Sequence, residues 1–77
     1  MPLKTGDLIH VPSETIVYRM DDMGMAHDFY KLLSPQSLLI VDNSNNEFLE
    51  EHYYKVFFQE DDDWYVRKQD VYEVKNE

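Results

Sequence analysis

Three histidines and sixteen acidic residues are the side chains of this 77-residue sequence best suited to metal binding or proton transfer. His10, His27 and His52 form no i, i+4 pair, and neither an HExxH nor an EF-hand pattern occurs. The chain also lacks cysteine, a glycine-rich phosphate loop and a recognisable nucleophile beside its base. We therefore expect no enzyme activity, no metal site and no cofactor. His10 alternates with Ile9 and Val11, which predicts a surface position.

Aromatic side chains are the second group that could form a site, because rings are enriched at the centres of protein interfaces. More rings occur than the core of so short a chain can hold. Either long loops fold over the surplus rings, or some of them form a protein-binding patch. The rings in question are Tyr18, Phe29, Tyr30, Tyr53, Phe57, Tyr65 and Tyr72.

Acidic residues give the chain a formal net charge of −9, from sixteen acids against seven bases. A potential of this sign repels phosphate backbones and anionic lipids, so we expect no direct binding of nucleic acid or membrane. Two acidic groups should meet at one rim of the molecule, either as a solvated surface or as an imitation of a phosphate array. They are Asp21, Asp22 and Asp28, and Asp42, Glu47, Glu50 and Glu51.

Most segments between turn signals alternate with period two or are rich in β-branched and aromatic residues, which predicts strands. Leu38–Val41 is apolar throughout, which is typical of a strand covered on both faces. The short length allows one hydrophobic core, so residues 1–77 should form a single domain. The predicted strands are Asp7–Val11, Thr15–Met20, Leu38–Val41, Tyr53–Phe58 and Trp64–Arg67.

The last two of these strands should form a hairpin across Gln59–Asp63, because aspartate is tolerated in turns and four acids are best placed at a hydrated tip. Period two then puts one set of residues on the core face. This set is Tyr54, Val56, Phe58, Trp64 and Val66.

Two segments are ambiguous. Ser44–Glu47 fits a capping box, and apolar residues recur after it at helical spacing, so we expect one short helical turn near residues 46–52. Met25–Leu33 also shows helical spacing, and we interpret it as a long loop that enters a strand near Phe29.

Four stretches resemble small SH3-like barrels across nearly the whole chain: "GDLIHVPS", "YYKVFF", "EDDDW" and "WYVRKQDVYEV". More narrowly, they resemble SH3-like proteins of unknown function from contractile-tailed phages of marine cyanobacteria. The resemblance implies an all-β, five-stranded barrel with a long loop after strand 2, and a 3₁₀ turn before a short last strand. Arg67 and Asp70 stand where proline-binding SH3 domains carry Pro and Tyr, so a groove for proline peptides is not implied.

These patterns favour a protein-binding module that engages a host or phage protein in the host-cell cytoplasm. The opening residues lack the apolar region of a secretory signal, and the longest apolar run, Leu38–Val41, is too short to span a membrane. The alternatives are an acidic nucleic-acid mimic and a structural homo-oligomer or virion component. The candidate binding residues are Tyr18, Asp21, Asp22, Phe29, Tyr30, Glu50, Glu51, Tyr53, Lys55 and Phe57.

Overall fold

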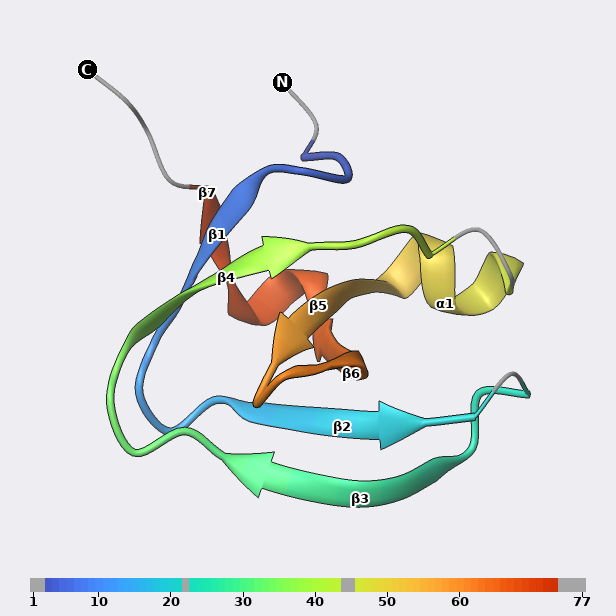
Figure 1. The fold of residues 1–77 in the computed structure, drawn as a ribbon, viewed down its shortest axis with the longest axis horizontal. Coiled ribbons are helices and arrows are strands. Elements are labelled where there is room, and N and C mark those ends of the chain that lie inside the picture. The colour runs from blue at the N-terminus through green and yellow to red at the C-terminus, as the bar shows by residue number, and fades with distance from the viewer. Residues whose placement is uncertain (1–2, 22, 44–45, 74–77) are drawn as a thin grey trace.

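The computed structural model describes residues 3–21, 23–43 and 46–73, which form one antiparallel sheet with a short helix at its rim (Figure 1). The prediction of an all-β protein is confirmed. The strands are β1 (Leu8–Val11), β2 (Ile16–Met20), β3 (Ala26–Lys31), β4 (Gln36–Ile40), β5 (Tyr53–Phe58), β6 (Asp61–Arg67) and β7 (Tyr72–Glu73), and the helices are α1 (Glu47–His52) and the 3₁₀ turn η1 (Lys68–Asp70).

The seven strands pair in the order β3-β2-β6-β5-β4-β1-β7. Strands β4, β5 and β6 are consecutive neighbours, whereas β2 packs beside β6 and the short β7 returns to β1. Strands β3 and β7 lie at the two ends of this order. The sheet is thus open along its pairing, and a closed five-stranded barrel is not confirmed.

The core lies on one face of the sheet, where alternate residues of β1, β2, β4, β5 and β6 meet. The predicted core face of the β5–β6 hairpin is confirmed: Val56, Phe58, Trp64 and Val66 are buried, and Tyr54 packs against them. Period two explains this result, since residues two apart on a strand share a face. The remaining buried members are Ile9, Val11, Val17, Leu32, Leu38 and Ile40.

Strand β4 is covered on one face only, so the prediction from the apolar run Leu38–Val41 is wrong. Leu38 and Ile40 are buried, but Leu39 is 41% exposed. On the outer side, Leu39 is paired with Leu8 of β1 and Phe57 of β5, which are exposed as well. An apolar row on the surface has here the same sequence signature as a doubly covered strand.

The turn between β5 and β6 is shorter than predicted. Gln59 and Glu60 alone form it, with φ angles of 52° and 62°. Positive φ at both central residues is what a two-residue type I′ hairpin requires. The three aspartates that were assigned to the turn, Asp61–Asp63, instead begin β6.

The strand predicted near Phe29 is confirmed as β3, but the long loop predicted before it is wrong, because β3 begins at Ala26. Strands β2 and β3 make an arm at one side of the molecule (Figure 1), with Val17 opposite Tyr30 and Tyr18 opposite Phe29. Aromatic residues suit such a pairing. At the base of the arm Leu32 is buried, and its amide donates to the Thr15 carbonyl at 2.9 Å.

The short helix is confirmed as α1. The side chain of Asn46 caps it by accepting a hydrogen bond from the Leu49 amide at 3.1 Å. Part of the predicted capping box, residues 44–45, lies outside the described residues. In the part of the chain that the structure describes, no helix is long and apolar enough to cross a membrane.

Candidate functional site

Four rings from four different elements form a row on the outer surface, which we call the aromatic row: Phe29 of β3, Tyr18 of β2, Tyr53 of β5 and Phe48 of α1. Their centroids lie 5.6 Å apart for Phe29 and Tyr18, 6.2 Å for Tyr18 and Tyr53, and 6.4 Å for Tyr53 and Phe48. Each neighbouring pair meets edge to face, which is a favoured geometry for aromatic rings.

The fold builds this row through strand register and the end of α1. Tyr18 is directly opposite Phe29 on one side and Tyr65 on the other. Tyr18 points outward because Val17, its neighbour on β2, is buried in the core. Tyr53 follows α1 directly and starts β5, so its ring lies between the strands and the helix.

The rings of the aromatic row are accessible without being loose. Phe29 is 63% exposed and Phe48 is 55% exposed, whereas Tyr18 and Tyr53 are half-buried between them. Exposed rings held by their neighbours lose little side-chain entropy when a partner covers them.

Two hollows flank the Phe48 and Tyr53 rings, which line both of them. One hollow, of about 370 Å³, lies toward η1 and is also lined by Arg67 and Lys68. The other, of about 210 Å³, lies toward the tip of the β2–β3 arm and is also lined by Met23. The two rings therefore form a ridge between two depressions.

Charged groups border the hollow at η1. Arg67 Nε lies 3.1 Å from Asp70 Oδ2, and this carboxylate raises the pKa of Arg67. Lys68 Nζ lies 5.0 Å from the centroid of the Tyr54 ring. Glu51 and His52 of α1 line the same hollow. The lining of the hollow thus combines two cations with a carboxylate.

The predicted acidic residues of the rim have different environments. Asp21 accepts hydrogen bonds from the amides of Met23 and Met25 and lies 2.9 Å from His27 Nε2. The Met25 amide, and then His27, hold the pKa of Asp21 below its ordinary value. Asp21 therefore organises the tip of the β2–β3 arm, whereas Asp22 lies outside the described residues.

The tip of this arm and α1 do lie together at one rim, since Met23, Gly24, Asn46 and Leu49 line one hollow. Glu50 and Glu51 are exposed on α1.

The other predicted residues are not part of the aromatic row, although Lys55 shares the outer face of β5 with Tyr53. Tyr30 is on the opposite face of the arm, with its ring 5.4 Å from that of Phe58. Lys55 Nζ lies 5.9 Å from the Tyr65 ring centroid. Phe57 belongs to the exposed apolar row of Leu8, Leu39 and Phe57.

Among the surplus rings, Tyr65 is buried, and the side chain of Lys55, not a loop, lies over its ring. The side chain of Tyr72 lies outside the described part of the structure. Phe48 was missed as a site residue. Its position after the capping residue Asn46 was visible in the sequence, but the direction of its ring depends on where α1 meets β5.

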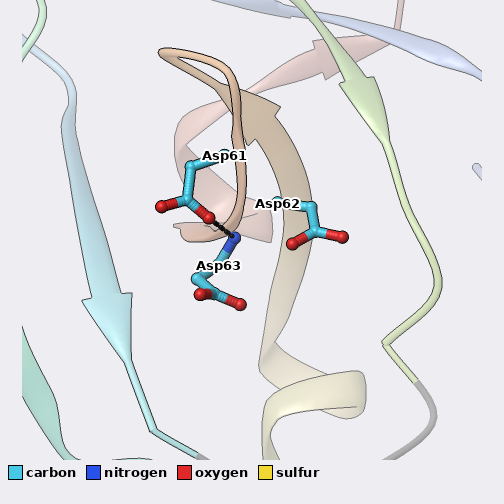
Figure 2. Close-up of side chains that lie close together, drawn as sticks. All are labelled: Asp61, Asp62 and Asp63. Carbon is cyan, nitrogen blue, oxygen red and sulfur yellow. Dashed lines mark hydrogen bonds between the residues drawn. The ribbon is translucent and has the colours of Figure 1, made fainter.

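Asp61, Asp62 and Asp63 form a cluster in which one carboxylate oxygen of each residue lies within 4.8 Å of one from each of the others (Figure 2). Asp61 is already engaged, by an ion pair with Arg19 and by the Asp63 amide at 3.2 Å. Exposed carboxylates of this kind are common without a metal, and the cluster alone assigns none. The expectation of a chain without a metal site stays a prediction.

Comparison with family models, with curated proteins and with solved structures gives no match for this chain.

Proposed function

We propose that the chain is a non-enzymatic protein-binding module that holds its partner on the aromatic row. The observation that carries the proposal is the row itself: four rings from four elements in edge-to-face contact, of which Phe29 and Phe48 are exposed. Clustered rings near the centre of a polar rim are typical of residues that dominate binding energy. The two hollows beside Phe48 and Tyr53 offer places for side chains of the partner.

The partner segment should carry basic as well as apolar side chains. The net charge of −9 favours encounter with a cationic surface. Glu50 and Glu51 stand exposed beside the row, where they can meet lysine or arginine at the rim.

The proposal includes an SH3-like arrangement of the sheet and a role as a phage accessory protein in the host cytoplasm. The order of elements supports the first part: β4, β5 and β6 are consecutive neighbours, and η1 then leads to a short β7 beside β1. The second part rests on the sequence resemblance alone.

The test is affinity capture from lysate of the infected host, with the partner then purified and its affinity measured for matched variants. Tyr53→Ala and Phe48→Ala should each weaken binding by about tenfold or more, as for rings at an interface centre. Phe57→Ala removes an exposed ring of the same sheet outside the aromatic row and should leave the affinity within about twofold. A loss of affinity with Phe57→Ala, and none with Tyr53→Ala or Phe48→Ala, would contradict the proposal.

The second candidate is the acidic nucleic-acid mimic. The observation in its favour is that Asp62 and Asp63 are exposed at one end of the sheet and Glu50 and Glu51 at α1. A mimic should compete with DNA or RNA for its partner, and its affinity should fall steeply with salt. Under the aromatic proposal, Glu50→Lys/Glu51→Lys changes the association rate and salt dependence more than the dissociation rate.

A further inference from the structure

Strand β3 is an unprotected edge of the sheet. It pairs with β2 alone among the described strands, and each of its six residues is exposed. The arm that carries it lies at one side of the molecule (Figure 1), and no described strand pairs with the outer side of β3. Edges of this kind are templates for added strands.

The outward backbone groups of β3 belong to Phe29 and Lys31. The Leu32 amide donates inward to Thr15, and alternate residues of an antiparallel strand turn their N–H and C=O groups to opposite sides. Phe29 and Lys31 therefore face away from β2. In agreement, the Phe29 amide donates to the Asp28 carboxylate at 2.8 Å and not to a strand.

The charge of β3 differs from that of the chain as a whole. Ala26–Lys31 contains one acid, Asp28, and one base, Lys31, beside a histidine. In a chain of net charge −9, this edge is where two copies can approach with little repulsion.

We propose that β3 pairs with β3 of a second copy, antiparallel about a two-fold axis at Tyr30. A two-fold axis that relates neighbouring antiparallel strands is perpendicular to the sheet. If it passes between the two copies of Tyr30, each residue faces the one at the same distance on the other side of Tyr30. Phe29 then exchanges backbone hydrogen bonds with Lys31 of the second copy, and the reverse. Tyr30 faces Tyr30 across the axis.

Charge and burial both fit this register. The Asp28 carboxylate is released from the Phe29 amide when that amide bonds to the strand of the second copy. No like charges are directly opposite, since Asp28 faces Leu32. The exposed side chain of Phe29 gains a lysine stem as its cross-strand neighbour.

The dimer goes beyond the proposed function and leaves it intact. Because the axis is perpendicular to the sheet, the outer faces of both copies point the same way. Tyr18, Tyr53 and Phe48 do not lie on the edge and remain accessible. Two aromatic rows would thus be presented on one side, which increases avidity for a partner with repeated segments.

The first experiment measures mass against concentration by sedimentation equilibrium, for the full chain and two variants. Lys31→Pro removes an outward N–H without removing a bond to β2, as proline is tolerated on such edges. It should raise the dimer dissociation constant at least about tenfold. Lys31→Thr keeps the N–H and should dimerise nearly as well. A monomeric wild-type chain at millimolar concentration, or a dimer that Lys31→Pro leaves unchanged, would overturn the proposal.

The second experiment uses the absence of cysteine from the chain. Facing residues at a non-hydrogen-bonded antiparallel position have Cα atoms about 4.5 Å apart, within the range of a disulfide. Tyr30→Cys should therefore give a covalent dimer under mild oxidation, faster than Leu33→Cys, which is on the same arm but far from the axis. Equal rates for the two variants would contradict the register.

Discussion

Leu32 and Leu33 are neighbours in the sequence with opposite surroundings. Leu32 is 0% exposed within the core, and Leu33 is 85% exposed. The contrast arises at the base of the β2–β3 arm, where the backbone of Leu32 bonds to Thr15 and Glu14 and its side chain enters the core. This residue fixes the arm, and with it Tyr18 and Phe29, to the rest of the sheet.

Leu32→Ala should lower the free energy of unfolding by about 2–5 kcal/mol, because it leaves a cavity in the core. Leu33→Ala removes the same atoms at the surface and should change it by less than about 0.5 kcal/mol. Urea unfolding followed by Trp64 fluorescence measures both. Equal costs for the two variants would contradict the placement of the arm.

Asp21 gives the tip of the arm a pH dependence. Since the pKa of Asp21 is lowered in the folded chain, its contribution to stability is present above its ordinary value and is lost as the pH falls through the lowered value. Asp21→Asn should therefore destabilise the chain at neutral pH, and the difference from wild type should shrink in acid.

Thermal unfolding at several pH values measures this difference. Asp63→Asn, which neutralises an exposed carboxylate on another strand, is the matched control. A cost of Asp21→Asn that stays constant down to the lowest pH would show that the Asp21 carboxylate does not stabilise the tip through its charge.

At the scale of elements, the β5–β6 hairpin has an unfavourable turn sequence for its backbone. Gln59 and Glu60 both adopt positive φ, which costs a residue with a Cβ about 1–2 kcal/mol. Gln59→Asn/Glu60→Gly supplies the residues that type I′ turns prefer and should raise the free energy of unfolding by about 1 kcal/mol. The measurement is chemical denaturation. Gln59→Ala/Glu60→Ala, which keeps a Cβ at both turn positions, should give no gain.

The elements that could be predicted from the sequence are those with one buried face. Val56, Phe58, Trp64 and Val66 alternate with outward residues, and this period identified both the hairpin and its core face. Strand β3 has no such signal, because both of its faces are exposed and its residues are fixed by pairing with β2. Strand β4 was predicted wrongly for a different reason. Its exposed residue Leu39 is apolar, so the sequence is apolar on both faces although only one face is buried.

The candidate site could be predicted only in part. Surplus aromatic residues indicated that some rings lie at the surface, and Tyr18, Phe29 and Tyr53 do so together. Which rings meet depends on contacts between β2, β5 and α1, which are distant in sequence. Phe48 could not be assigned before the helix was placed against the sheet.

At the scale of the whole molecule, one open sheet presents three distinct surfaces. The aromatic row crosses β3, β2, β5 and α1; an apolar row of Leu8, Leu39 and Phe57 crosses β1, β4 and β5; and Asp61–Asp63 stand at the start of β6. We propose that the partner binds to the first of these surfaces, the aromatic row.

The most direct test is an NMR titration of the isotope-labelled chain with its purified partner, in which the backbone amides that shift on binding are mapped onto the structure. We predict the largest changes at Tyr18, Phe29 and Phe48–Tyr53, around the aromatic row. Changes centred on Leu39 and Phe57, or on Asp61–Asp63, with the aromatic row unaffected, would contradict it.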